Sequence, residues 1–148
     1  MRHVLLISLV VLFSCNDGVR TAIDPSNCAT DVEVPNIDCN DDACTKELVT
    51  IWVEVLDQDG NGVIFDEFSL TNLDTGEEIQ INSYINYAIV AGNYIIAEDQ
   101  MFESVEQQGT CIEFRGSING ELIVRQTFLI GHDCCHVVRW AGPETIRL

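Results

Sequence analysis

Apolar and polar side chains alternate along the part of the chain that follows residue 47. Val49, Ile51, Val53 and Val55 occupy every second position, with polar or aromatic residues between them. A period of two with β-branched residues is typical of a strand that has one buried face. Similar short stretches recur to the end of the chain, over residues 63–73, 77–81, 87–90, 94–98, 110–118, 121–131, 134–140 and 144–148.

Turn residues separate these stretches, and no amphipathic helix is expected. Asn119-Gly120 is the strongest short hairpin signal in the chain. The strand after it is expected to bury four apolar residues on one face: Leu122, Val124, Phe128 and Ile130. The sequence therefore predicts an all-β fold, an antiparallel β-sandwich of immunoglobulin-like or transthyretin-like type with seven to nine short strands.

The N-terminus has the parts of an export signal. Arg2 precedes an apolar run over residues 4–13, which is too short to span a bilayer. The following Ser14-Cys15 resembles the cleavage site of bacterial lipoproteins, in which the cysteine is lipidated. We expect residues 1–14 to be a lipoprotein signal peptide and Cys15 to anchor the protein to a membrane. The alternative is an ordinary signal peptide that contains a cysteine.

Residues 15–46 differ from the rest in composition. They are acidic, contain Pro25 and Pro35 and show little periodicity, so we expect a tether between the lipid and a sandwich domain at residues 47–148. The tether also contains Cys28, Cys39 and Cys44. A purely disordered linker would not need three cysteines, so at least its second half is expected to be cross-linked.

The chain is strongly acidic, with 24 Asp and Glu against seven Lys and Arg and a formal net charge of −17. Residues 1–14 contain one of those basic residues and no acidic residue, so their removal makes the chain more negative. Such a surface repels phosphate backbones, and we exclude nucleic acid as a partner.

The cysteine count predicts a disulfide framework. If Cys15 carries lipid, six of the seven cysteines remain, and an even number in an exported domain indicates up to three disulfides. Strand alternation places Cys134 and Cys135 on opposite faces, with Cys111 on a polar face. We expect Cys111 to pair with one of the two adjacent cysteines, and the other adjacent cysteine to pair with Cys28, Cys39 or Cys44 of the tether. The candidates are Cys28, Cys39, Cys44, Cys111, Cys134 and Cys135.

The turn after the first strand resembles the start of a calcium-binding loop. Asp57, Asp59 and Asn61 supply oxygens at the first, third and fifth positions, and a glycine follows. The bidentate glutamate of the twelfth position is replaced by Phe68. Asp, Asn and Gly are also the residues that a tight turn favours, and a structural turn is the preferred interpretation, with calcium as the alternative cofactor.

The run from His132 to His136 carries metal ligands of the type that zinc and copper bind, and Cys134 and His136 are the candidates. On a continuous strand the two histidines would lie about 13 Å apart, too far to share one ion. Catalysis by Cys135 with His136 is disfavoured because strand neighbours face opposite ways and exported thiols oxidise. No enzymatic activity is predicted.

Aromatic residues offer a candidate binding face. Trp52 lies opposite the apolar face of the first strand, and Tyr84, Tyr87 and Tyr94 fall in one segment. The preferred alternative is that they fill the core.

Two stretches resemble known families. Residues 49–79, VTIWVEVLDQDGNGVIFDEFSLTNLDTGEEI, are similar to the opening of transthyretin-like or carboxypeptidase-regulatory-like sandwiches, and DCCHV with the following AG resembles the ending of uncharacterised lipoproteins of Bacteroidota. The first resemblance implies a non-catalytic accessory or adhesion module.

The sequence therefore predicts a lipid-anchored protein of the cell envelope, on the periplasmic or surface face of the outer membrane. Its domain is expected to be a non-enzymatic binding or accessory module for an unknown envelope protein or glycan. A calcium- or metal-binding structural domain is the second hypothesis, and an enzyme is the third.

Overall fold

The computed structural model describes residues 28, 32–40, 44–81 and 92–148. The described strands form two sheets, one of three strands in the order β4-β1-β8 and one of five in the order β3-β2-β5-β6-β7. The strands are β1 (Thr50–Leu56), β2 (Glu67–Asn72), β3 (Glu78–Ile79), β4 (Asn93–Glu98), β5 (Thr110–Ile118), β6 (Glu121–His132), β7 (Val137–Ala141) and β8 (Thr145–Arg147).

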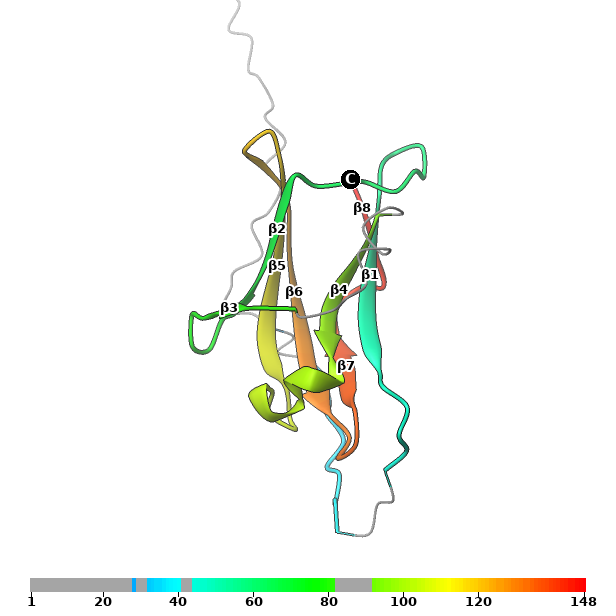
Figure 1. Cartoon of the computed structure of the whole chain (residues 1–148), viewed down its shortest axis with the longest axis vertical. Coiled ribbons are helices and arrows are strands. Elements are labelled where there is room, and N and C mark those ends of the chain that lie inside the picture. Colours follow the sequence, from blue (N-terminus) through cyan, green and yellow to red (C-terminus); the bar gives the residue numbers. More distant parts are fainter. Residues whose placement is uncertain (1–27, 29–31, 41–43, 82–91) are drawn as a thin grey trace, which may run out of the picture.

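The two sheets face each other as the layers of a sandwich, so the predicted fold class is confirmed (Figure 1). One pairing departs from the antiparallel pattern. The final strand, β8, runs parallel to β1, with Glu54 opposite Thr145 and Leu56 opposite Arg147. The strand predicted at residues 87–90 lies outside the described residues.

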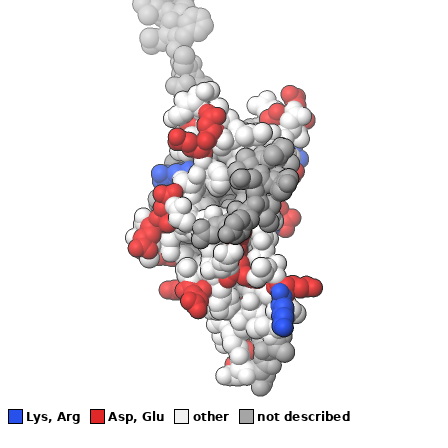
Figure 2. All heavy atoms as spheres, in the orientation of Figure 1, with Lys and Arg blue, Asp and Glu red and all other residues white. Residues whose placement is uncertain are grey.

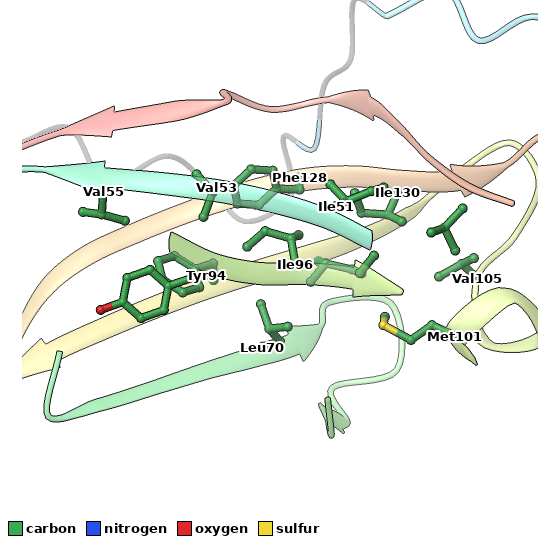
Figure 3. Close-up of a cluster of buried hydrophobic side chains, with 14 of the residues drawn as sticks. Ile51, Val53, Val55, Leu70, Tyr94, Ile96, Met101, Val105, Phe128 and Ile130 are labelled. Carbon is green, nitrogen blue, oxygen red and sulfur yellow. The ribbon is translucent and has the colours of Figure 1, made fainter. Parts of the chain in front are cut away.

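The core lies between the layers, where the alternation in the sequence places apolar side chains. In β1, Ile51, Val53 and Val55 are buried while the residues between them are only half-buried. Facing them from the larger sheet are Leu70, Phe128 and other buried residues (Figure 3). Burial of each such side chain contributes about 1.5–3 kcal/mol, so this cluster provides the main stabilisation of the sandwich.

The predicted Asn119-Gly120 turn is confirmed. Asn119 has a φ of 53° and Gly120 a φ of 77°, as a two-residue hairpin with positive φ at both positions requires. Near this turn a bulge shifts the β5–β6 register, so that Val124 pairs with Gly116 but Leu122 pairs with Ser117. The prediction that Leu122 shares the buried face was therefore wrong. Its side chain is 51% exposed, because the bulge reverses the alternation at the end of the strand.

A short 3-10 helix, η2 (Asp99–Ser104), follows β4 and was not predicted. Its six residues are too few for an amphipathic period to stand out in the sequence. Met101 is buried against the core and fixes the helix at the end of the sandwich. No helix within the described ranges is long and apolar enough to cross a membrane.

The outer face of the larger sheet contains a buried carboxylate. Glu113 of β5 is fully buried and forms ion pairs with Arg115 of the same strand and Arg125 of β6. The two arginines are opposite each other across the strands, and each guanidinium group binds a different oxygen of the carboxylate. This network satisfies a charge that would otherwise be costly to bury.

Candidate functional site: the disulfide-linked end of the sandwich

Three disulfides join the tether to the sandwich. Their Cα–Cα distances are 5.8 Å for Cys28–Cys111, 5.4 Å for Cys39–Cys134 and 5.2 Å for Cys44–Cys135. All six candidate cysteines are paired, which confirms the predicted disulfide framework. In Figure 1 the tether residues 32–40 reach the turn between β6 and β7 at one end of the sandwich.

The expected pairing of Cys111 with Cys134 or Cys135 was wrong. Cys111 pairs with Cys28, and both adjacent cysteines pair with the tether. The alternation argument assumed that a strand begins at Cys134, whereas β7 begins at Val137. Residues 133–136 form a turn in which Cys134 has a φ of 86°, so its neighbours need not point to opposite faces and both sulfurs reach the same segment.

Asp133 shapes this turn. Its Oδ1 accepts hydrogen bonds from the backbone N–H groups of Cys135 (3.1 Å) and His136 (2.9 Å), and its own N–H donates to the carbonyl of His136 (3.0 Å). An aspartate that binds the backbone two and three residues ahead stabilises a turn. The turn presents the cysteines and His136 toward the tether.

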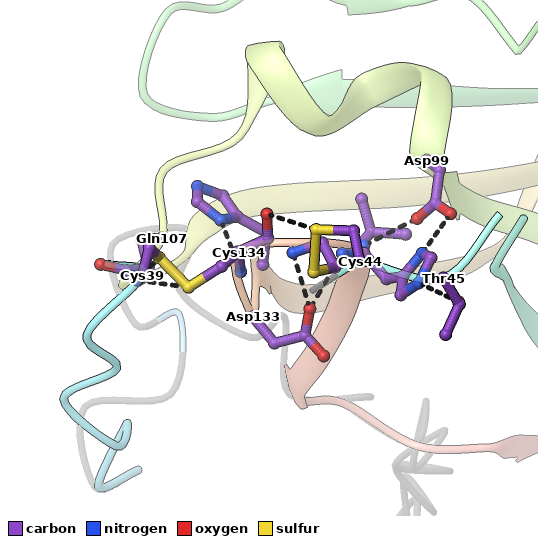
Figure 4. The surroundings of a disulfide bond; sticks show 11 residues. Cys39, Cys44, Thr45, Asp99, Gln107, Asp133 and Cys134 are labelled. Carbon is purple, nitrogen blue, oxygen red and sulfur yellow. Dashed lines mark hydrogen bonds and ion pairs between the residues drawn. A yellow bond between two sulfur atoms is a disulfide. The ribbon is translucent and has the colours of Figure 1, made fainter. Parts of the chain in front are cut away.

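The carboxylate of Asp99, at the start of η2, connects three parts of this end. Its Oδ2 accepts from the N–H of Val49 (2.7 Å) and lies 2.7 Å from Nδ1 of His136, and its Oδ1 accepts from the N–H of Val137 (2.9 Å) (Figure 4). The start of β1, the start of β7 and η2 are therefore held by one side chain, which is mostly buried.

Burial raises the pKa of Asp99, but the hydrogen bonds from Val49, His136 and Val137 outweigh it, and the net pKa lies below its ordinary value. The carboxylate is thus held in its ionised form, which is the form that accepts all of these bonds.

Thr45 completes a hydroxyl–imidazole–carboxylate series. Its Oγ1 lies 3.0 Å from Nε2 of His136. Thr45 and His136 directly follow the bonded pair Cys44 and Cys135, so this disulfide brings the two side chains together. We call Thr45, Asp99 and His136 the His136 cluster.

The His136 cluster has the order of groups found in nucleophilic hydrolases, which also need donors for an oxyanion. Here the backbone N–H groups of His136 and Val137 already donate to Asp133 and Asp99. Both ring nitrogens of His136 are engaged within the cluster. These contacts hold the tether and the turn together.

The side chains predicted as zinc or copper ligands are otherwise occupied. The sulfur of Cys134 is bonded to Cys39, so it is not a thiolate. The ring of His132 lies 4.2 Å from that of Phe102, centroid to centroid, and its Nδ1 accepts a hydrogen bond from the N–H of Cys134 (3.4 Å). The described parts of the chain contain no group of three or more His, Cys, Asp or Glu side chains that could hold a metal ion.

The candidate calcium loop is closed by its own hydrogen bonds. Oδ1 of Asp57 accepts from the backbone N–H groups of Asp59 (2.9 Å) and Asn61 (2.8 Å), and Nδ2 of Asn61 donates to Oδ2 of Asp57 (3.1 Å). Hydrogen bonds from Asn61, led by its side chain, lower the pKa of Asp57. The structure brings Asp57 and Asn61 together as a turn. A melting midpoint that rises with calcium and falls with EDTA would be the signature of a calcium site.

The aromatic residues considered for a binding face lie in different environments. Tyr94 is fully buried, and its hydroxyl donates to the carbonyl of Val63 (3.0 Å) and accepts from the N–H of Phe65 (2.8 Å), so it belongs to the core. Trp52 is half-buried on the outer side of β1. Tyr84, Tyr87 and the lipidation candidate Cys15 lie outside the described residues.

Sequence reasoning missed Thr45 and Asp99. The signal for Thr45 was its place directly after a cysteine, which matters only once the partner of that cysteine is known. Gln107 was also missed. Its Nε2 donates to the carbonyl of Ile37 (3.0 Å) and its carbonyl accepts from Nε1 of Trp140 (3.0 Å), so it joins the tether to β7.

Comparison with known proteins adds no further constraint on this site. No protein-family model matches the chain, and neither curated proteins nor solved structures give a significant match.

Proposed function

We propose that this chain is a lipid-anchored protein of the cell envelope whose β-sandwich is a non-enzymatic binding or accessory module. The observation that carries the proposal is the set of three disulfides between the tether and the sandwich. Structural disulfides persist in oxidising compartments outside the cytosol, which agrees with the export signal expected at residues 1–14.

The disulfides also determine what a lipid on Cys15 would do. Cys28 is bonded to β5, and residues 15 to 28 are separated by 28 − 15 = 13 peptide units. A chain of that length spans at most about 45 Å. The sandwich would therefore stay close to the membrane, although the tether is 32 residues long by sequence (46 − 15 + 1).

The acidic surface supports a role of the sandwich in binding a partner rather than in direct contact with lipid headgroups. Figure 2 shows many acidic and few basic side chains on the visible face. Such a surface repels anionic lipid headgroups and attracts basic partners. The resemblance of residues 49–79 to accessory sandwich domains supports the same role.

Fractionation of cells that express Cys15→Ala tests the anchor. We expect the variant to leave the membrane fraction and appear in the soluble fraction, because it lacks the acylated residue. Asn16→Ala is the matched control, since it changes the next residue and retains the cysteine. Equal membrane recovery of the Cys15→Ala variant and the control would refute the lipid anchor.

A further inference from the structure

A cleft of about 650 Å³ lies between the two sheets, on the side where β3 and β4 are the edge strands. Carboxylates of Glu77, Glu78 and Glu98 line it, and Ile79 and Met101 add apolar surface. None of the three residues of the His136 cluster lines this cleft, although Glu98 and Gln100, on either side of Asp99, do. The cleft is therefore a second site, not part of the disulfide-linked end.

Glu98 is the unusual residue in the cleft. It is the last residue of β4 and is only 7% exposed. None of the described residues donates a hydrogen bond to its carboxylate or forms an ion pair with it. No fully buried side-chain oxygen among the described residues lacks a partner, so the carboxylate oxygens of Glu98 open onto the cleft. A charged group that is mostly buried and has only this opening is costly, and a ligand in the cleft would supply the missing partner.

The surroundings hold Glu98 in place. The next residue, Asp99, is bound to Val49, His136 and Val137, and Met101 is buried two residues further on. The backbone on the C-terminal side of Glu98 is therefore fixed by tertiary contacts, so the carboxylate is held at the cleft. A preorganised charged group of this kind is suited to binding a ligand.

We propose that the cleft binds an organic cation, an ammonium or guanidinium group at the end of an aliphatic stem, with the charged group on Glu98. The three glutamates supply negative charge, while Ile79 and Met101 can contact the stem. These carboxylates do not belong to any group of three or more placed to hold one metal ion within the described residues. A metal ion needs several oxygen ligands around one point, whereas an extended organic cation can interact with carboxylates that are spread around a cleft.

The ionisation of Glu98 agrees with this ligand class. Burial raises the pKa of Glu98. A cation in the cleft would offset that desolvation and favour the charged carboxylate. Binding is therefore expected to weaken when the pH falls far enough to protonate Glu98.

Met101 offers a reporter in the cleft. The chain contains two methionines, Met1 and Met101, and only Met101 lies after residue 14. We would label the methionine methyl groups with ¹³C in the full processed protein, purified in detergent, and titrate it with Nα-acetyl-lysine methylamide. The norleucine analogue, which has the stem without the ammonium, serves as the ligand control. We expect a saturable shift of the Met101 signal with the lysine compound only.

Glu98→Gln keeps the shape of the side chain and removes its charge, and we expect it to weaken binding about tenfold or more. The matched control is Glu121→Gln, which makes the same charge change at the exposed β5–β6 hairpin and should alter affinity less than about twofold. Equal affinities in the two variants, or a shift with the norleucine analogue, would overturn the proposal. A second titration uses cadaverine, which represents a small free amine, whereas the lysine compound represents a side chain of a protein partner. Saturable binding of either compound supports the proposal that the cleft binds an organic cation.

The folded state of Glu98→Gln is expected to be retained. A group whose folded-state pKa is raised stabilises the fold at low pH and loses that contribution as the pH rises, so its removal should not lower stability at pH 7. This inference rests on the proposed binding function. If no cation binds while the protein still fractionates with membranes through Cys15, the cleft assignment fails and the anchor stands.

Discussion

Two neighbouring carboxylates show how strongly local contacts determine the behaviour of a residue. Glu98 and Asp99 are adjacent in the chain, but Asp99 accepts three hydrogen bonds and has a lowered pKa, whereas Glu98 accepts none from the described residues and has a raised pKa. Hydrogen bonding to the charged form accounts for the first shift and desolvation for the second. We therefore assign Glu98 to binding and Asp99 to holding the structure.

Asp99→Asn should destabilise the domain by about 1–3 kcal/mol at pH 7, because the amide cannot accept all the bonds of the carboxylate. The folded-state pKa of Asp99 is lowered, so its contribution is present above about pH 4 and is lost as the pH falls through the folded-state value. Chemical denaturation at pH 7 and at acidic pH measures the difference. Asp59→Asn, at an exposed turn position, is the control, and an equal loss in both variants would contradict the role of Asp99.

At the level of the elements, irregularities in the strands decide which side chains reach the core. The bulge between Gly116 and Ser117 turns Leu122 outward and lets Ile123 pack on the core instead. In β5 itself, Gly116 lies under the ring of Phe65, which leaves no room for a Cβ. The aromatic cluster of Phe65, Tyr94 and Phe114 depends on this close approach.

Gly116→Ala should therefore destabilise the sandwich by about 1–3 kcal/mol through overpacking, since its backbone is extended and imposes no other penalty. A thermal melt of the variant beside Ser117→Ala, which changes the next residue on the opposite face of β5, measures the effect. An unchanged midpoint for Gly116→Ala would show that Phe65 moves aside without cost.

For the whole molecule, the disulfides connect residues that are 83, 95 and 91 positions apart. Cross-links over such long segments restrict the unfolded chain strongly, and removal of one native disulfide costs about 2–5 kcal/mol. They also bring the tether, which has no strand of its own in the described ranges, into the folded structure. The tether and the sandwich should therefore unfold together.

Peptide mapping under non-reducing conditions should recover the pairs Cys28–Cys111, Cys39–Cys134 and Cys44–Cys135. Fragmentation between Cys134 and Cys135 assigns the last two, because one peptide contains both cysteines. Cys44→Ser with Cys135→Ser should lower the midpoint more than Cys28→Ser with Cys111→Ser, since only the former also separates Thr45 from His136. A cross-link between Cys111 and either adjacent cysteine would contradict the structure.

The sequence by itself determined the fold class, the even set of bonded cysteines and the hairpin at Asn119-Gly120. These features follow from local rules, because alternation reports which face of a strand is buried and a turn with positive φ demands particular residues. The expected export signal is equally local, and it awaits the fractionation experiment.

Only the tertiary structure decided which cysteines pair and which side chains meet at the His136 cluster. Thr45, Asp99 and His136 lie far apart in the chain, and a sequence carries no distance between such positions. Alternation also failed where a strand was interrupted, at the turn over residues 133–136 and at the bulge in the β5–β6 pair that turns Leu122 outward. A further bulge, in the β1–β4 pair, precedes Glu98. The period of two holds only for continuous strands, so the interrupted positions, which carry both candidate sites, became visible only in the folded chain.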